Sequence, residues 1–309
     1  MRIHAIGFDF LKPYCEEYAE FVEDPAQADF VLSMNNAGGP GFAVIGMARA
    51  TADKYGKPFC WWTIEDPNSH LAYLPQAKKA DYVFTSDKAL IPQYRQAVGH
   101  DRVFWLPLAA SESIHRPLPL ADDAADFVFS GNWYPYGARK WGDQTVILPL
   151  ARAGYSMAIF SYEEPPYPEL KAFWRGGTSC YTTAEQYTHG KVVLGANCQR
   201  SGMDGIAKTY MTSMRTFEAL ACGKAFLAPH SDAYEALGFH QGYHMGVIID
   251  PGAALCWGEH SIRNDKCLSD AAVEMAEAGR AFVVANHTYG HRLRRIAAAI
   301  VAKAEPEDL

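Results

Sequence analysis

The chain has 309 residues, of which 49% are hydrophobic, so it contains enough apolar material for two ordinary domains or one large one. Its 28 basic and 35 acidic residues give a formal charge of -7, and its longest basic run is RLRR, at Arg292 to Arg295. Tight, sequence-independent binding to duplex nucleic acid is therefore disfavoured, because it needs a concentrated field of lysine and arginine. A local basic cleft is not excluded by this composition.

Seven cysteines are spread along the chain without a C-x-x-C pair, which indicates neither a disulfide framework nor a zinc site. We expect these cysteines to be reduced. The N-terminus becomes polar and acidic within its first ten residues, so no signal peptide is predicted. No apolar run approaches the ~20 residues that a membrane span needs. The sequence predicts a soluble, cytoplasmic protein without a membrane span or a metal site.

In the first half, short hydrophobic runs alternate with helix-like segments. The runs predicted as strands are residues 2–8, 29–36, 57–65, 81–87 and 102–109. The helix-like segments between them include residues 42–56, 71–80 and 88–99. This alternation predicts βαβ units and a parallel sheet.

A second series of the same kind follows a stretch rich in proline and aspartate at residues 117–126, which is typical of a linker. Strands are predicted at residues 126–132, 155–161, 190–197, 224–229 and 245–250, with helices among them and a helical tail after Ser269. We therefore expect an α/β protein of two Rossmann-like domains that face each other across a cleft. Ligands of such sheets bind beyond the carboxyl ends of the strands.

One glutamate, Glu218, lies in a predicted helix of small apolar residues. Thr212 and Ser213 are candidate N-cap residues, and Gly223 is expected just after the helix. A carboxylate in such a segment needs partners, because desolvating an unpaired charge is costly. One interpretation is an ion pair with Arg215, three residues earlier, worth a few tenths of a kcal/mol. The other is a carboxylate that accepts hydrogen bonds from two ribose hydroxyls, beside an arginine and a helix N-terminus that face a diphosphate.

The segment RTFEALACGKAFLAP, followed by DAYEALGF, resembles the nucleotide-sugar segment of GT-B glycosyltransferases, specifically the CgeB-type spore-maturation family with its R-x-F-E-A-L-A-C-G pattern. FCWWTIEDP, DYVFTSD, FVFSGNWYPYGARKW and ANHTYGHRLRRI fall in the same order as in that family. The resemblance covers most of the chain. It implies an acceptor-side domain at residues 1–118, a donor-binding domain at residues 119–285, and a C-terminal helix at residues 286–309 that packs back onto the first domain.

The resemblance implies an enzyme that moves a sugar from a nucleotide diphosphate donor to an acceptor hydroxyl. Glu218 matches the ribose-binding second glutamate of the E-x7-E element, and Arg215 and the amides near Ser213 would lie by the diphosphate. The first glutamate is replaced by Tyr210, which leaves retention or inversion open. No cofactor is implied beyond the donor, expected to be UDP-linked. No metal is required, because positive side chains and helix dipoles would stabilise the leaving diphosphate.

The loop SGN follows the first strand of the second half. Gly131 allows a close approach of the backbone to a phosphate. Gly131 and Asn132 are both expected to bind the donor. Arg139, on the following helix, is predicted to bind phosphate. The neighbouring Lys140 is expected on the solvated surface.

Polar residues end the third predicted strand of the first half. Asp66 precedes Pro67, which holds it extended and can present its side chain at the mouth of a cleft. Inverting sugar transfer needs a general base, and we predict Asp66 as the catalytic or acceptor-orienting group. Glu65, His70 and Asn35 are predicted on the acceptor side. The alternative is that this segment is only an Asp-Pro turn with a capping role. For His70 this structural role is the favoured interpretation.

His287 and His291 have the i, i+4 spacing of zinc ligands, but without a third ligand or an H-E-x-x-H pattern a structural role is predicted. Two alternatives to a glycosyltransferase stay open. One is a sugar-nucleotide epimerase of the same fold, and the other is a non-catalytic sugar-nucleotide binding module in which Tyr210 marks lost chemistry. The acceptor is not indicated: a glycan, a small molecule, a peptide or a modified nucleic acid would each fit.

Overall fold

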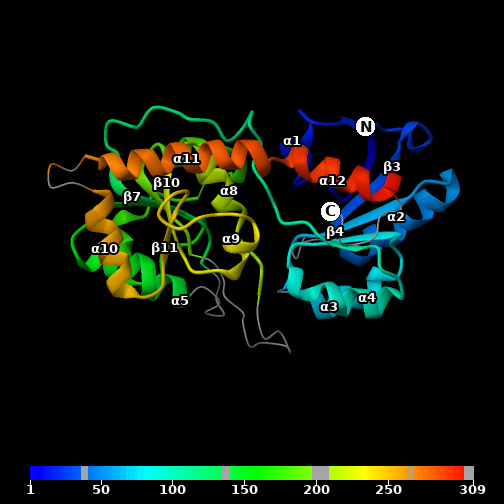
Figure 1. Cartoon of the computed structure of the whole chain (residues 1–309), viewed down its shortest axis with the longest axis horizontal. Helices are drawn as coiled ribbons and strands as arrows, with labels where there is room; N and C mark the ends of the chain where they lie inside the picture. Colours follow the sequence, from blue (N-terminus) through cyan, green and yellow to red (C-terminus); the bar gives the residue numbers. More distant parts are fainter. Residues whose placement is uncertain are drawn as a thin grey trace. The chain divides into compact units, whose positions relative to one another are not determined.

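The computed structural model describes residues 1–35, 41–67, 69–133, 140–177, 179–196, 209–262, 265 and 267–302. The chain forms two compact units, of which the first comprises Met1–Ala109, Arg200–Met211 and Tyr289–Leu309 and the second Ala110–Gln199 and Thr212–Thr288. The leading segment of the first unit thus ends at Ala109, whereas the resemblance to the glycosyltransferase family implies a boundary at 118/119. In Figure 1 the last helix, α12 (Tyr289–Ala302), drawn in red, lies among the blue and cyan elements of the first unit.

The first unit is built on a six-stranded parallel sheet with strand order β2-β1-β3-β4-β5-β6. Its strands are β1 (Arg2–Ile6), β2 (Glu20–Phe21), β3 (Phe30–Asn35), β4 (Phe59–Thr63), β5 (Tyr82–Thr85) and β6 (Val103–Trp105). Its other helices are α1 (Lys12–Cys15), α2 (Gly41–Tyr55), α3 (His70–Ala77) and α4 (Ile91–Val98), with short 3-10 turns η1 (Pro25–Gln27) and η2 (Lys88–Leu90). The strands predicted in this half are confirmed, and β2 is additional.

Strand β4 lies at the centre of the first unit's core. Its successive residues Trp61 and Trp62 are both fully buried, so helices must cover both faces of the sheet. The Trp61 ring meets Tyr73 of α3 edge-on at 5.6 Å, and the Trp62 ring meets Tyr289 of α12 at 6.2 Å. The Trp62 indole also donates a hydrogen bond to the Leu106 carbonyl at 2.7 Å. Helix α12 is therefore part of this core.

A buried arginine of α12 holds the end of the first unit's leading segment. Nε of Arg292 donates to the Pro107 carbonyl at 2.8 Å, and Nη2 donates to the Leu108 carbonyl at 3.1 Å. Two hydrogen bonds from one guanidinium fix these carbonyls in a set orientation. The chain leaves the first unit directly after this clamp, at Ala109.

The second unit is built on a five-stranded parallel sheet with strand order β11-β10-β9-β7-β8. Its strands are β7 (Ala125–Ser130), β8 (Met157–Phe160), β9 (Gly190–Leu194), β10 (Ala225–Pro229) and β11 (Gly246–Ile248). Its helical segments are α5 (Lys140–Gly142), the π-helical η3 (Asp143–Ile147), α6 (Leu148–Arg152), η4 (Pro168–Phe173), η5 (Cys180–Thr182), α7 (Thr183–Tyr187), α8 (Met214–Ala221), α9 (Asp232–Ala236), α10 (Pro251–Ser261) and α11 (Asp270–Asn286). The strands predicted for this half are also confirmed.

Both faces of the second sheet are buried. Phe127 and Phe129 of β7 point to a cluster that includes α6 and α10, while Val128 between them points to a cluster that includes Phe217 and Leu220 of α8. Side chains alternate between the faces of a strand, so this strand needs apolar residues throughout.

In each sheet the chain starts on an inner strand and then winds outward in both directions. The two directions part between β1 and β3 in the first unit, and between β7 and β9 in the second. Ligands of such sheets bind at the carboxyl ends of the strands beside this point. In the second unit the loop after β7 and helix α8, which follows β9, are therefore the segments to inspect.

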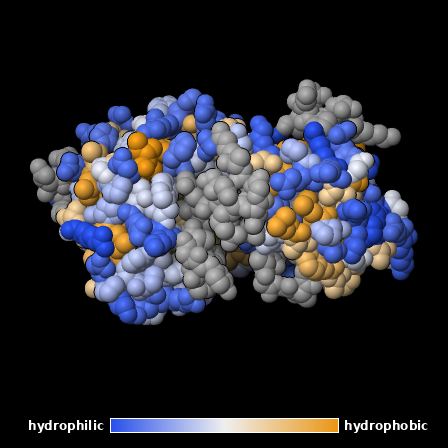
Figure 2. All heavy atoms as spheres, turned by 90° about the horizontal axis from the view of Figure 1, so that it is seen from below, coloured by the Kyte–Doolittle hydropathy of each residue, from blue (hydrophilic) through white to orange (hydrophobic). Residues whose placement is uncertain are grey.

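No helix in the described ranges is long and apolar enough to cross a membrane. In Figure 2 most described residues on the face shown are hydrophilic, and hydrophobic residues occur there in small groups. The cysteines of the described part are all free thiols: Cys15, Cys60, Cys180, Cys222, Cys256 and Cys267.

Candidate functional site

Helix α8 carries Glu218 into the core of the second unit. Ser213 is its N-cap, and the Ser213 hydroxyl accepts a hydrogen bond from the Arg215 backbone N–H at 3.3 Å. Gly223 follows the C-cap with a φ of 68°, a conformation that glycine adopts without steric cost. The predicted N-cap and C-terminal glycine are confirmed. Glu218 itself is only 2% exposed, so its charge lies where desolvation is costly.

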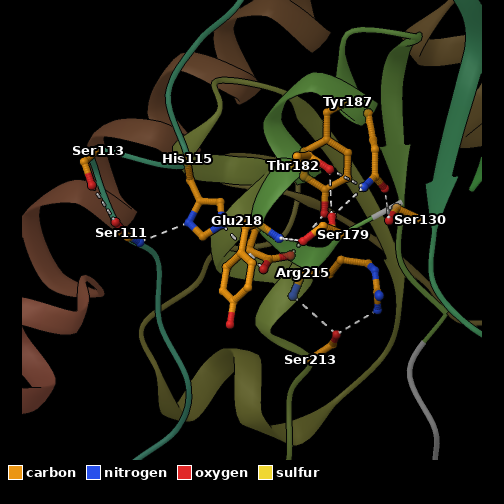
Figure 3. A network of polar contacts seen from close by, with 12 residues as sticks. Ser111, Ser113, His115, Ser130, Ser179, Thr182, Tyr187, Ser213, Arg215 and Glu218 are labelled. Carbon is orange, nitrogen blue, oxygen red and sulfur yellow. Dashed lines mark hydrogen bonds and ion pairs between the residues drawn. The ribbon is translucent and has the colours of Figure 1, made fainter. Parts of the chain in front are cut away.

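Two side chains from distant parts of the sequence face the Glu218 carboxylate, as Figure 3 shows. The Tyr187 hydroxyl, at the end of α7, donates a hydrogen bond to Oε2 at 3.3 Å, and Nε2 of His115 lies 3.5 Å from Oε1. Burial, followed by the nearby Glu218 charge, raises the pKa of Tyr187 well above its usual range, so the phenol stays protonated. Among the described residues Glu218 makes no ion pair with Arg215, and the intrahelical ion-pair interpretation is therefore wrong.

His115 is held by its own loop. The Ser111 backbone N–H donates to Nδ1 of His115 at 3.0 Å, and the His115 backbone N–H donates to the Ser111 carbonyl at 2.8 Å. A ring nitrogen that accepts a hydrogen bond carries no proton, so the neutral imidazole is protonated on Nε2. This tautomer directs an N–H group toward Glu218.

The Arg215 side chain folds back over the N-terminus of its own helix. Nη1 donates to the Ser213 hydroxyl at 3.3 Å, and the guanidinium carbon lies 6.0 Å from the centre of the Phe129 ring. Nε of Arg215 is buried and has no hydrogen-bond partner in the described part of the chain. Buried donors are nearly always satisfied, and within the described residues this nitrogen keeps a hydrogen bond to offer. A helix N-terminus also favours an anion there.

The loop after β7 lies close to Arg215, because Phe129 beneath the guanidinium is the penultimate residue of that strand. The Gly131 N–H donates to the Phe160 carbonyl at 2.8 Å, so this amide is already in use. The Asn132 side-chain oxygen accepts a hydrogen bond from the Tyr162 backbone N–H at 3.3 Å.

Three further residues named from the sequence are Arg139, Asn35 and Lys140. Arg139 lies outside the described residues. Asn35 ends β3, and its side chain lies outside the described part. Lys140 begins α5 and is exposed, as predicted.

The Asp66 carboxylate is fully buried in the first unit. Oδ2 accepts hydrogen bonds from the hydroxyls of Thr63 and Thr85, and Oδ1 accepts one from Tyr94 at 3.0 Å. The prediction that Asp66 presents its side chain at the mouth of a cleft is therefore wrong, because three hydroxyls hold the carboxylate inside the core. Burial raises the pKa of Asp66 to about 7, although the hydrogen bonds from Thr63, Thr85 and Tyr94 act to lower it. Its catalytic role stays a prediction.

Of the other acceptor-side residues, Asn35 ends β3, where it is paired in register with Thr63 at the end of β4. Glu65 is half-buried, and burial raises its pKa. His70 is buried at the start of α3, where Nδ1 donates to the Pro67 carbonyl at 2.8 Å. This hydrogen bond supports the turn interpretation for His70.

Tyr210, which replaces the first glutamate of the E-x7-E element, belongs to the first unit. Its backbone N–H donates to the Asp87 carboxylate at 2.8 Å, and the Thr209 hydroxyl donates to the other oxygen of Asp87 at 2.6 Å. Asp87 is fully buried just after β5 and also caps η2 through the Ala89 N–H. This role of Asp87 was not predicted from the sequence.

His287 packs as a structural residue of the second unit. Its Nε2 donates to the Leu237 carbonyl at 3.0 Å, and its ring stacks on Phe239 at 5.3 Å. His291 belongs to the first unit. In the described ranges, no group of three or more His, Cys, Asp and Glu side chains is placed to hold a metal ion.

His115 and Tyr187 were not predicted from the sequence. Neither lies in a periodic pattern that points to Glu218, because His115 is in an irregular segment and Tyr187 is at a helix end. The one sign in the sequence is a histidine among serines, SESIH, between a hydrophobic strand and the proline-rich linker.

Comparison with known proteins gives one family and several related folds. A family model described as glycosyl transferase-like matches residues 139–298. The structure of Anabaena Alr3699/HepE in complex with UDP and glucose is similar over 98% of this chain and 100% of that one, with a TM-score of 0.63 and 10% identity. Comparison with the sequences of curated proteins gives no match.

Two further structures share the fold. Sucrose-phosphate synthase from Thermosynechococcus elongatus matches over 95% of this chain and 77% of its own, with a TM-score of 0.58 and 12% identity. The lipopolysaccharide outer core galactosyltransferase WaaB, in its apo form, matches over 98% of this chain and 100% of its own, with a TM-score of 0.54 and 12% identity. The two-sheet α/β fold predicted from the sequence is thereby confirmed.

Proposed function

This chain belongs to the glycosyl transferase-like family and is a nucleotide-sugar-dependent glycosyltransferase of the GT-B fold, and from that premise we propose that its second unit binds a UDP-linked donor around Glu218. The enzyme moves a sugar from a nucleotide diphosphate to an acceptor hydroxyl. The structure of Alr3699/HepE, which contains UDP and glucose, supports the choice of UDP. The observation that carries the proposal is a buried carboxylate with spare acceptor capacity on the same helix as a guanidinium with a spare donor.

Glu218 binds the ribose in this proposal. An ionised carboxylate has two oxygens with about four acceptor positions. Among the described residues only the Tyr187 hydroxyl donates a hydrogen bond to it, and His115 faces it from the other side. The remaining positions suit the two neighbouring hydroxyls of a ribose.

Arg215 and the N-terminus of α8 bind the diphosphate. Nε of Arg215 has no partner among the described residues, and it and the first N–H groups of the helix both favour a negative charge near Ser213. Asn132 and Arg139 would add donors from the side of β7, with Gly131 keeping that loop close. Arg215 would stabilise the charge that develops on the leaving diphosphate, a contribution that often dominates catalysis.

Within the family we propose a CgeB-type member. The proposal rests on the R-x-F-E-A-L-A-C-G pattern at Arg215–Gly223. Each part of that pattern has a structural role in α8: Arg215 lies at the N-terminus, Glu218 lies in the core and Gly223 follows the C-cap. The substitution at Tyr210 remains a difference from the E-x7-E element of retaining GT-B enzymes.

Isothermal titration calorimetry with UDP, ADP, GDP and CDP tests the donor site. UDP should bind most tightly, and at 100 times its Kd it should add about 2.7 kcal/mol to the unfolding free energy.

Glu218→Gln should weaken UDP binding by about tenfold or more, because it removes acceptor capacity and charge. Glu185→Gln makes the same change on an exposed glutamate of the same unit and should bind UDP normally. No preference for UDP, or wild-type affinity in a folded Glu218→Gln protein, would refute the proposal.

A further inference from the structure

We propose that His115 is a positioning residue that fixes the Glu218 carboxylate for recognition of the donor ribose, an inference that rests on the proposed function. His115 comes from the segment before β7, far from α8 in the sequence, and does not belong to the R-x-F-E-A-L-A-C-G pattern. Its side chain is 0% exposed and that of Glu218 is 2% exposed, so the pair meets away from solvent. Figure 3 shows the imidazole directed at the carboxylate.

The direction of the proton makes this contact specific. Because the Ser111 N–H donates to Nδ1, the neutral ring carries its proton on Nε2, the atom 3.5 Å from Oε1 of Glu218. This distance is longer than the 2.7–3.2 Å typical of N–H···O hydrogen bonds. Hydrogen bonds in ligand-free sites are often long and shorten when the ligand binds. A movement of a few tenths of an ångström would complete this one.

Two donors on opposite oxygens would fix the rotation of the carboxylate. Tyr187 donates to Oε2, and His115 faces Oε1. Each carboxylate oxygen has two lone pairs, so the described residues leave one on each oxygen unused. Two free acceptor positions on one fixed plane match the two neighbouring hydroxyls of a ribose. Without His115, Oε1 would lose the contact that sets this plane.

A second histidine in the same unit provides a matched control. The His240 N–H donates to Nδ1 of His244 at 3.0 Å, and the His244 N–H donates to the His240 carbonyl at 2.9 Å. This is the local arrangement of Ser111 and His115. The His244 ring, however, stacks on Phe282 at 4.3 Å. A substitution of His244 therefore measures the cost of losing such a histidine without touching Glu218.

Two substitutions of His115 separate its two nitrogens. In His115→Asn the amide oxygen can take the place of Nδ1 and accept the Ser111 N–H, but the shorter side chain brings no donor to Oε1 of Glu218. In His115→Gln the amide nitrogen can take the place of Nε2 and donate to Glu218. His244→Asn is the control. Calorimetry on the full chain would measure the Kd of UDP and of 2′,3′-dideoxy-UDP, which lacks both ribose hydroxyls.

The ratio of the two affinities is the readout, because a general loss of stability would not change it. The wild-type protein should bind UDP about tenfold more tightly than the dideoxy compound, or more. The ratio should fall to about twofold in His115→Asn, recover in His115→Gln and keep its wild-type value in His244→Asn. An unchanged ratio in folded His115→Asn would overturn the inference and leave the proposed function intact. A wild-type protein that binds both compounds equally would instead refute the ribose role of Glu218 and, with it, both proposals.

Nitrogen-15 NMR of histidine-labelled wild-type protein gives a test that does not depend on a variant folding. We expect His115 to be protonated on Nε2 and not on Nδ1, with the Nε2 proton resonance moving downfield on addition of UDP. The dideoxy compound should cause a smaller shift. A His115 ring protonated on Nδ1 would overturn the inference.

Discussion

Asp66 in the first unit and Glu218 in the second are both buried carboxylates, yet their partners differ. Asp66 accepts hydrogen bonds from the hydroxyls of Thr63, Thr85 and Tyr94. Glu218 accepts one at 3.3 Å from Tyr187 and has the His115 ring 3.5 Å away on its other side. From the described residues, Asp66 thus accepts three hydrogen bonds, whereas Glu218 accepts one.

The comparison shows that burial by itself does not indicate the role of a carboxylate. Desolvation is costly in both places, and in each the chain supplies donors to offset it. What differs is the remaining capacity, because a carboxylate whose oxygens are occupied has little to offer a ligand. The count of donors around a buried acid therefore separates a structural group from a candidate binding group.

The largest expected effect is on the pH dependence of stability in Asp66→Asn. The pKa of Asp66 is about 7 in the folded protein and 3.8 in the unfolded reference. Between these values the unfolded chain releases the proton that the folded chain keeps, so the wild type loses stability as pH rises. The loss relative to Asp66→Asn should reach about 4 kcal/mol between pH 4 and pH 8.

Urea unfolding of both proteins at several pH values measures this difference. Asp126→Asn is a control of opposite sign, because hydrogen bonds from Ser156 and Lys191 outweigh burial there and lower the pKa of Asp126. The stability that Asp126 contributes is lost as pH falls, not as it rises. Parallel curves for the wild type and Asp66→Asn would show that Asp66 is not held as the structure indicates.

The same Asp66→Asn protein also tests the predicted catalytic role. Loss of a general base lowers turnover by roughly 10²- to 10⁴-fold. Because both oxygens of Asp66 are occupied by hydroxyl donors, we expect the release of UDP from donor sugars to stay within about tenfold of wild type. A larger loss of turnover in folded protein would support Asp66 as the general base. The number of donors around a buried carboxylate would then not distinguish Asp66 from Glu218.

Arg215→Met tests the donor site that we propose around Glu218. Removing a charge that stabilises the leaving diphosphate should lower the rate of UDP release by about 10²- to 10³-fold. Methionine keeps much of the length of the side chain, so the fold should persist. Arg152→Met, which removes an exposed arginine paired with Glu169, is the control. Equal rates in the two variants would leave Arg215 without a role in the chemistry.

Tyr187→Phe should have a smaller effect. The hydroxyl donates to Glu218 across 3.3 Å, a long hydrogen bond, so its loss should raise the Kd of UDP by only about threefold. Tyr155→Phe changes a partly exposed tyrosine of the same unit and should not affect UDP binding. If Tyr187→Phe weakened binding as much as Glu218→Gln does, Tyr187 would be in contact with the donor itself.

Chelation of metal ions should have no effect on activity. In the proposed site Arg215 and the α8 N-terminus, with Arg139, supply the positive charge that a metal ion provides elsewhere. UDP release measured in EDTA should therefore match the untreated enzyme. Activity that disappears in EDTA and returns with Mg²⁺ or Mn²⁺ would show that these groups do not suffice.

The periodic parts of the molecule could be predicted from the sequence. Strand β4 reads FCWWT and is buried throughout, and the caps of α8 follow from Ser213 and Gly223. The pattern around Glu218 indicated the candidate site because its residues lie on one helix. Contacts between separate elements could not be predicted in the same way.

The partners of Asp66 illustrate this limit. Thr63 ends β4, Thr85 ends β5 and Tyr94 is in α4, so only the folded chain brings the three hydroxyls together. His115 meets Glu218 for the same reason, from a segment without any period. Side-chain periodicity indicates which face of an element is buried, but not which polar groups meet on that face.

Neither half of this enzyme could be exchanged as a single cassette. The chain passes between its units after Ala109, Gln199, Met211 and Thr288. A gene fragment for residues 110–288 would carry Thr209 and Tyr210 without the Asp87 that holds them.

A fragment ending at Ala109 would in turn lack Arg292, which clamps the carbonyls of Pro107 and Leu108. Recombination between related enzymes would have to move several segments together to keep these contacts.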